Sequence, residues 1–212
     1  YLKTLTDNIL YRDVMVRNKI LNENEIFELI RYTSSNVSKP ITYNSLRKVI
    51  HVKQAATVRQ YLHFIENTYL IFLINKFDFS VKNQMYNPKK VYYIDNAIAM
   101  LNGFHFSEDR GRLLENQVFI QLRRSGKEIF YHNASKECDF LIFENNKITK
   151  AIQVTTGIAD EKVKEREVAG LMDALNSYDL DKGLILTESD NENFIIKGKS
   201  IEVLPIWKWM LG

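Results

Sequence analysis

The chain has 212 residues, of which 45% are hydrophobic and 26% charged, a composition typical of globular protein with room for one large or two small domains. Its single cysteine, Cys138, excludes an intrachain disulfide and gives no zinc-ligand spacing. No apolar run approaches the roughly 18 residues of a membrane span, and the first residues lack the layout of a signal peptide. We therefore expect a cytoplasmic protein without membrane contact. Because the first residue is Tyr1 and not Met, we also expect a segment upstream of it.

Charge and glycine content change near the middle of the chain. Up to Phe106 there are 14 Lys and Arg against 8 Asp and Glu, and from Ser107 onward there are 15 against 18. All eight glycines lie at or after Gly103. These shifts predict two domains, residues 1–106 and 107–212, of which the basic first domain is the better polyanion binder.

Helices predominate in the first predicted domain. Apolar residues at helical spacing predict a helix over 22–33, and Pro40 marks the break after it because proline forces its predecessor out of the helical region. Two shorter helices follow within 42–67 and are joined by a tight turn at His51 and Val52. The sequence thus predicts a helix pair closed by a short turn.

Two strands complete the first predicted domain. β-branched and aromatic residues predict strands within 67–77 and 89–96, separated by a loop over 81–88. Two helices with a short turn, followed by a two-stranded ribbon, have the element order of a winged helix-turn-helix. The sequence therefore predicts an N-terminal winged helix-turn-helix domain.

The second helix of the predicted pair carries polar side chains on its outward face. Lys and Arg can contact phosphates, and Gln or Thr can read base edges, so this helix suits duplex DNA. The candidate DNA-binding residues are Lys53, Gln54, Thr57, Arg59, Gln60 and His63. The alternative is a solvated face, or a face that packs on a partner domain.

Helices alternate with strands in the second predicted domain. The predicted elements are a helix over 112–125, strands over 128–133, 138–145 and 148–155, a helix over 163–178, a strand over 182–187, and a strand with a short aromatic helix over 201–211. This order predicts an α/β sheet with helices packed on it, so the fold class of the whole chain is mixed α/β. The histidines, among them His51 and His132, are expected at turns and on the surface.

Three elements of this second domain bring together groups suited to metal-dependent hydrolysis. Glu115 lies in the first helix, Asp139 in the second strand and Gln153 in the third. Cleavage of a phosphodiester with a divalent metal needs hard oxygen ligands at one sheet edge and a cation nearby. Restriction-endonuclease-like enzymes, which this half resembles, hold Glu, Asp and an acid-any-Lys triplet at these places. Here the triplet reads Gln153, Val154, Thr155.

The altered triplet makes this a degenerate nuclease-like site. A neutral amide binds Mg²⁺ more weakly than a carboxylate, and Thr155 supplies no positive charge for the transition state. The candidate metal ligands of an active site are Glu115, Asp139 and Gln153. The candidate replacement cations are Lys162, Lys164 and Arg166. The alternative is a buried polar network, with Glu137 included, that holds sheet and helix together.

The motifs, taken in order, resemble the C-terminal region of archaeal and bacterial AAA+-type ATPases that carry a domain of unknown function. The segments that carry this resemblance are YLKTLTDNILYRDV, AATVRQYLHFIENTYLI, PKKVYYIDNAI, GRLLENQVFIQL, ECDFLIF, AIQVT and KVKEREVAGLMDAL. The resemblance implies an upstream ATPase domain, a winged helix and a restriction-endonuclease-like α/β fold at the end. ATP would then bind only in the upstream domain, and this chain would hold no cofactor except Mg²⁺ if its nuclease-like site is active.

Three functions are compatible with the sequence. The first is a DNA-binding or targeting module with a degenerate nuclease-like domain, acting on double-stranded DNA beside an ATPase domain of the same protein. The second is a Mg²⁺-dependent DNA nuclease with a relocated lysine. The third is a docking platform for the ATPase or a protein client, and the sequence leaves homo-oligomerisation open.

Overall fold

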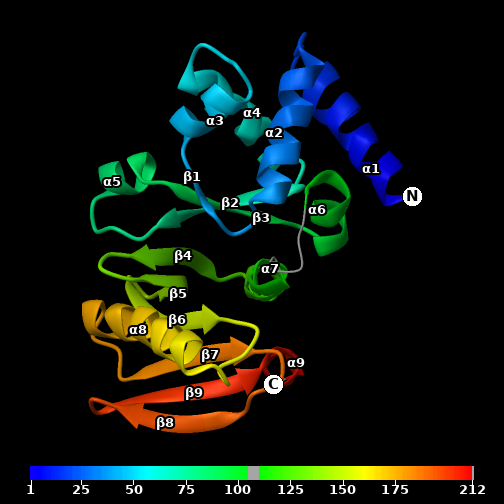
Figure 1. Ribbon diagram of the computed structural model, residues 1–212. Coiled ribbons are helices and arrows are strands. Elements are labelled where there is room, and N and C mark those ends of the chain that lie inside the picture. The colour runs from blue at the N-terminus through cyan, green and yellow to red at the C-terminus, as the bar shows by residue number, and fades with distance from the viewer. Residues whose placement is uncertain (105–109, 212) are drawn as a thin grey trace. The chain divides into compact units, whose positions relative to one another are not determined.

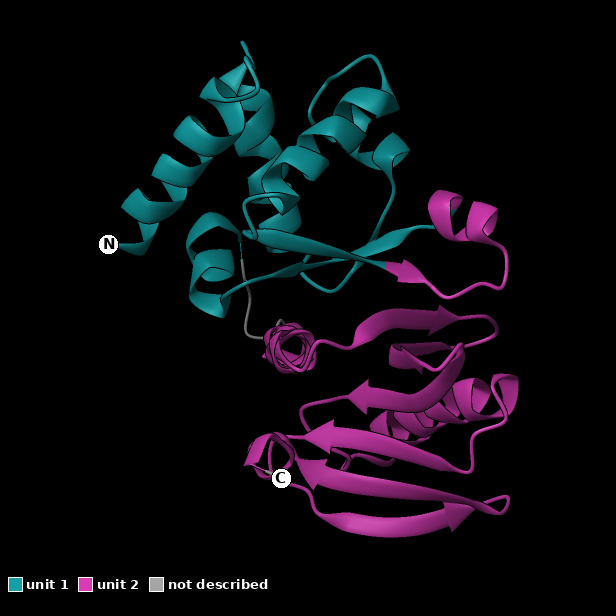
Figure 2. Cartoon of the chain, turned by 180° about the vertical axis from the view of Figure 1, so that it is seen from behind, with its two compact units in different colours: residues 1–74, 87–109 teal, residues 75–86, 110–212 magenta. Residues whose placement is uncertain are grey.

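The computed structural model describes residues 1–104 and 110–211. They form a mixed α/β protein whose nine described strands follow the order β1-β3-β2-β4-β5-β6-β7-β9-β8 in a mixed sheet (Figure 1), which confirms the predicted class. The chain divides into two compact units, unit 1 (1–74 and 87–109) and unit 2 (75–86 and 110–212), shown in Figure 2. The predicted domain boundary after Phe106 lies outside the described residues and stays a prediction.

Unit 1 is built of helices around one apolar core. Its helices are α1 (Leu2–Asn8), the π-helix η1 (Ile9–Val16), α2 (Glu23–Ser35), α3 (Tyr43–Val49), α4 (Ala55–Glu66) and α6 (Asn96–Asn102). The predicted helix over 22–33 and the predicted helix pair are present as α2, α3 and α4. The sequence analysis missed α6, which begins where the Asp95 carboxylate accepts hydrogen bonds from the backbone N–H groups of Ala97 and Ile98.

Three strands accompany these helices. They are β1 (Pro40–Ile41), β2 (Ile71–Lys76) and β3 (Lys89–Tyr93), and β1 pairs with β3 in the antiparallel sense. The prediction of a loop over 81–88 is wrong, because a short helix, α5 (Val81–Tyr86), occupies most of this segment. The residue before α5, Ser80, accepts a hydrogen bond at its Oγ from the Asn83 backbone N–H, as residues that start helices do.

Unit 2 alternates helices and strands as the sequence predicts. Its elements after α5 are α7 (Arg110–Arg124), β4 (Glu128–Asn133), β5 (Glu137–Glu144), β6 (Lys147–Val154), α8 (Glu161–Ser177), β7 (Lys182–Thr187), β8 (Glu192–Ile196), β9 (Lys199–Pro205) and α9 (Ile206–Leu211). Strands β4, β5 and β6 are antiparallel, whereas β6 pairs with β7, and β7 with β9, in parallel. The sequence analysis missed β8, which forms a hairpin with β9 through a turn where Lys197 and Gly198 both have positive φ.

The core of unit 2 lies between α8 and the strands β5, β6 and β7 (Figure 1). Leu171 and Leu175 of α8 are fully buried there, together with Leu141 of β5 and Ile185 of β7. Gly170 allows α8 to approach β5 closely, since a Cβ at this position would lie 2.1 Å from the Glu137 carbonyl oxygen. This contact sets α8 directly above the strands that carry Asp139 and Gln153.

Candidate nucleic-acid interface and nuclease-like cluster

The face of α4 that the sequence analysis assigned to DNA is open to solvent. Helix α3 starts with a capping box in which the Ser45 N–H donates to Thr42 Oγ1 and the Thr42 N–H donates to Ser45 Oγ. At the predicted turn His51 has a φ of 55°. The buried residues of α4 are Val58, Leu62 and Ile65. The predicted contact residues Lys53, Gln54, Arg59, Gln60 and His63 are exposed, and Thr57 is half-buried.

Beside this face lies a hollow of about 570 Å³. We call it the α4 hollow, and its lining residues are Tyr43, Ala56, Arg59, Gln60, His63, Glu66 and Leu73. Glu66, the last residue of α4, accepts a hydrogen bond at Oε1 from the Leu73 backbone N–H at 3.0 Å. The sequence analysis found Arg59, Gln60 and His63 but missed Tyr43 and Glu66, because they come from a different helix and from the end of α4.

Four groups in or beside the α4 hollow, Tyr43, Arg59, Glu66 and Lys89, are coupled by electrostatic interactions. Burial raises the pKa of Tyr43, the Arg59 charge opposes that rise, and the Glu66 charge adds to it. Burial lowers the pKa of Lys89, Arg59 lowers it further, and Glu66 opposes this effect. Arg59, Glu66 and Lys89 therefore lie close enough to act on one another, so a ligand in the hollow meets both signs of charge.

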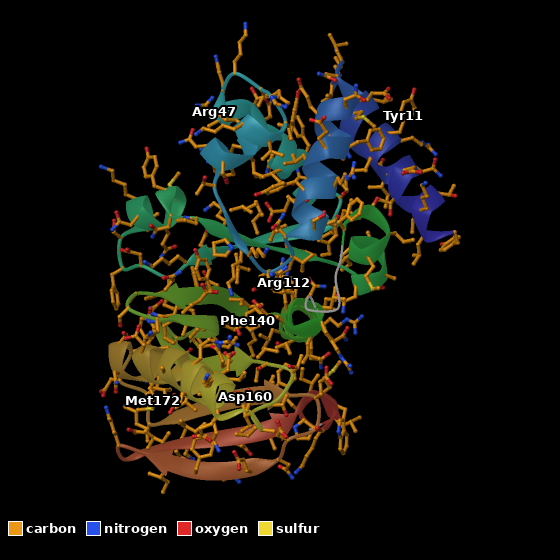
Figure 3. The ribbon with its side chains drawn as sticks, in the orientation of Figure 1. Tyr11, Arg47, Arg112, Phe140, Asp160 and Met172 are labelled. Carbon is orange, nitrogen blue, oxygen red and sulfur yellow. The ribbon has the colours of Figure 1, made fainter. Side chains whose placement is uncertain are left out.

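In unit 2, two of the polar groups predicted for a nuclease-like site, Asp139 and Gln153, meet on the face of the sheet that α8 covers. Strands β5 and β6 pair with Phe140 opposite Ile152, which places Asp139 beside Gln153. The Asp139 N–H donates to Gln153 Oε1 at 3.3 Å, and Asp139 Oδ2 accepts from the Val154 N–H at 3.0 Å. Both side chains are buried. Figure 3 labels Phe140 on β5 and Asp160 at the start of α8, the two elements that flank this region.

A carboxylate that the sequence analysis missed completes this group. Gln153 Nε2 donates to Glu167 Oε2 at 2.6 Å, and Glu167, on α8, is buried. Glu167 Oε1 in turn accepts from Arg166 Nε at 3.0 Å and from its Nη2 at 2.5 Å. Hydrogen bonding to Glu167 raises the pKa of Arg166, and the charges of Glu167 and Asp139 add to this effect. We call Asp139, Gln153, Arg166 and Glu167 the polar cluster.

The other predicted nuclease-like residues have different surroundings. Glu115 is buried on α7, a helix that packs against β4 and β6. Lys162 is exposed, and Lys164 donates from Nζ to Glu192 Oε1 at 2.8 Å and lies 4.7 Å from the centre of the Phe194 ring, both on β8. Of the three candidate replacement cations, Arg166 is the one whose described hydrogen bonds reach Glu167. Catalytic roles for these residues stay predictions.

No group of three or more His, Cys, Asp or Glu side chains is arranged to hold a metal ion within residues 1–104 and 110–211. The polar cluster contributes two carboxylates, and both are already hydrogen-bonded within the protein. The predicted Mg²⁺ ligands Glu115, Asp139 and Gln153 are not a group of this kind, because Gln153 carries an amide. Mg²⁺ binding therefore stays a prediction.

A second hydrogen-bond network surrounds the buried side chain of His132, where the expectation of a surface histidine is wrong. His132 is 3% exposed, and its Nδ1 lies 2.9 Å from the Tyr178 hydroxyl and its Nε2 lies 3.0 Å from Asp173 Oδ2. Asp173 also accepts from the Ser135 hydroxyl and from the Lys136 backbone N–H. These bonds tie the end of α8 to the connection between β4 and β5.

These observations define a mixed α/β protein with a helical N-terminal unit and a nine-stranded mixed sheet among its described residues. Residues 1–105 match the family model described as a domain of unknown function, DUF8612. The described helices include none that is long and apolar enough to cross a membrane.

Two curated proteins resemble the chain over nearly its whole length. The uncharacterized protein MJ1544 of Methanocaldococcus jannaschii is 36% identical over 226 residues, which cover 99% of this chain and 49% of that protein. An uncharacterized protein of Haemophilus influenzae is 23% identical over 215 residues, covering 99% of this chain and 52% of that protein. The chain thus spans about half the length of the curated relatives that it matches.

Among solved structures, the chain is similar to a chain in a half-complex from the tetradecameric assembly of Thermococcus gammatolerans McrB AAA+ hexamers with bound McrC. The sequence identity is 11% and the TM-score is 0.38, with 87% of this chain and 48% of that chain covered.

Proposed function

We propose that the chain is a DNA-binding module in which α4 is the recognition helix of a winged helix-turn-helix. The order α2, β1, α3, α4, β2, α5, β3 supports this proposal, since it is a helix, a strand, two helices and two neighbouring strands, with the short helix α5 in the connection between those strands. The observation that carries the proposal is an exposed polar surface formed by α4 and the two residues before it, since the helix begins at Ala55 and not at Lys53 as its sequence suggests. Arg59 of α4 and Lys53 before it can neutralise phosphates, and Gln60 and the N-cap residue Gln54 can reach base edges.

The proposal assigns no DNA contact to the tip of the β2–β3 ribbon. In many winged proteins this tip is a free wing, but here residues 75–86 belong to unit 2. Phe77 is buried in the core of unit 2 and makes edge-to-face contacts with Phe130 and Tyr178, each at 5.3 Å between ring centres. DNA affinity is therefore expected to depend on α4 and not on α5.

For unit 2 we propose a restriction-endonuclease-like fold whose polar cluster holds α8 on the sheet and does not cleave DNA. The supporting observation is a continuous series of hydrogen bonds that runs from Val154 through Asp139, Gln153 and Glu167 to Arg166. A satisfied network of this kind stabilises a buried polar region. In a longer protein, as the family resemblance implies, this module would act beside an ATPase domain.

The test is a fluorescence-anisotropy titration of a labelled DNA duplex at low and moderate salt, with Mg²⁺ present. Binding is expected to weaken steeply with salt, because phosphate neutralisation releases counterions. Arg59→Ala and Lys53→Ala should each lower the affinity several-fold and reduce the slope of log K against log salt by about 1. Lys182→Ala removes an exposed lysine from the start of β7 in unit 2 and serves as the matched control.

Each outcome of this titration has a clear meaning. Equal losses for Arg59→Ala and Lys182→Ala would indicate general charge attraction and contradict a recognition role for α4. Absence of binding at low salt would contradict the DNA-binding function and favour the docking platform. The DNA is expected to stay intact on a gel, whereas cleavage lost in Asp139→Asn would show that the polar cluster is an active nuclease site.

A further inference from the structure

A carboxylate lies within the proposed DNA-binding face. Glu66 lines the α4 hollow together with Arg59 and His63, and its described hydrogen bond, from the Leu73 N–H, engages Oε1. A carboxylate repels DNA phosphates, and here the nearby charges of Arg59 and Lys89 offset that repulsion. The partner it suits is a hydrogen-bond donor, and nucleic acids offer such donors on the amino groups of their bases.

The shape of the site points to a base that is not paired. Beside the protruding side chains that a recognition helix presents to the major groove of a duplex, this surface has a concave part. The α4 hollow is a concave space of about 570 Å³, with Tyr43 of α3 and Leu73 of β2 among its walls. Unpaired bases are bound in such pockets by aromatic and apolar walls together with polar contacts to their edges.

The charges around the α4 hollow also suit a nucleotide. Arg59 lines it, and Arg59 and Glu66 both act on the half-buried amine of Lys89. The site thus presents cations for a phosphate and a carboxylate for an amino group. A simple anion would satisfy the cations but would be repelled by Glu66.

We propose that the α4 hollow binds one unpaired nucleotide whose base carries an exocyclic amino group, with Glu66 accepting from that amino group and Arg59 contacting the phosphate. This inference rests on the proposed DNA-binding function and deepens it, since it names a substrate class for the same face. Cytosine satisfies the requirement through its N4 amino group, whereas thymine presents an acceptor, O4, at the same place. Glu66 is then a specificity-determining residue.

The experiment compares the binding of short labelled oligo(dC) and oligo(dT) by anisotropy at one salt concentration. The wild-type chain should bind oligo(dC) at least about fivefold more tightly, a ratio within the range expected for the net contribution of one hydrogen bond. Glu66→Gln should abolish this preference while oligo(dT) affinity stays equal or rises, because a repulsive charge is removed. The Gln side chain keeps a carbonyl oxygen for the Leu73 N–H, so the fold is expected to persist.

Glu28→Gln, at an exposed position of α2, is the matched control and should keep the oligo(dC) preference. If thermal unfolding shows that Glu66→Gln does not fold, Arg59→Ala replaces it. That variant should bind both oligonucleotides several-fold more weakly, with an unchanged ratio of oligo(dC) affinity to oligo(dT) affinity. A change in this ratio would contradict the roles assigned to Arg59 and Glu66.

A duplex titration run in parallel separates the two proposals. Suppose that the chain binds the duplex but binds oligo(dC) and oligo(dT) equally, or keeps its oligo(dC) preference in Glu66→Gln. Either result would overturn the nucleotide site and leave the DNA-binding function standing. Absence of binding to the duplex and to both oligonucleotides would overturn both.

Discussion

At the scale of single residues, the most informative group is the Asp173 carboxyl. Burial, the largest influence, raises its pKa, but hydrogen bonds from Ser135, His132 and the Lys136 N–H, with the charge of His132, together lower it from 3.8 to about 2. Because the folded-state pKa lies below the unfolded one, this carboxylate stabilises the fold fully above about pH 4. The contribution is lost as the pH falls through about 2.

Asp173→Asn should therefore change the acid stability of the protein. We expect the variant to unfold more easily at pH 7, and its free energy of unfolding to fall less steeply than that of the wild type between pH 4 and pH 2. Urea unfolding at several pH values measures both effects. Parallel stability curves for the two proteins over this range would contradict the assigned role of Asp173.

The candidate sites show which residues a sequence can reveal. Arg59 and Gln60 were predicted because outward polar positions follow from the helical repeat of α4. Glu66 and Glu167 were missed because the partner of each, the Leu73 N–H or the Gln153 amide, comes from a strand whose position only the fold determines. His132 was misplaced for the same reason, since its partners Asp173 and Tyr178 lie 41 and 46 residues away.

At the scale of elements, the contact between α8 and β5 depends on Gly170. An Ala Cβ there would meet the Glu137 backbone oxygen at 2.1 Å, and a backbone atom cannot move aside cheaply. Gly170→Ala should destabilise the protein by about 1–3 kcal/mol, since overpacking outweighs the better helix propensity of alanine.

Gly111→Ala is the matched control for that substitution. Gly111 also lies in a helix, α7, and among the described residues the atom that its Cβ would meet is Thr156 Cγ2, at 3.9 Å, an ordinary van der Waals distance. This variant should be neutral or more stable by up to about 1 kcal/mol. Thermal or urea unfolding of both variants measures the difference, and equal effects would mean that Gly170 is not needed for close packing.

The elements of the fold were largely predictable, and the exceptions have physical causes. Strands β4 and β7 have their predicted bounds because buried β-branched and aromatic runs end at polar residues. The sequence analysis made no prediction for α1, η1 and β1. It also missed α5, α6 and β8, which have five to seven residues each and offer little periodicity. Their signals were local, such as Asp95 before α6 and the Lys197–Gly198 turn after β8.

At the scale of the whole molecule, neither compact unit is a continuous stretch of chain. Residues 75–86 lie between two segments of unit 1 but belong to unit 2, where the last residues of β2 pair in parallel with β4, Asn75 opposite Phe130. Phe77 is 8% exposed and contacts Phe130, Phe143 and Tyr178. A fragment cut at the predicted domain boundary would therefore lose part of the unit 2 core.

This topology predicts how truncated and mutated proteins behave. Phe77→Ala in the full chain should cost about 3–5 kcal/mol, because truncating a buried phenylalanine leaves a cavity. Residues 107–212 expressed alone should be less stable than residues 75–212, since only the longer fragment supplies Phe77 and the strand that pairs with β4. Urea unfolding of the two fragments and of the variant tests this, with Tyr86→Ala, at a residue of the same segment that is 81% exposed, as the control. Equal stability of the two fragments would mean that residues 107–212 fold as an independent domain and that the aromatic contacts of Phe77 contribute little.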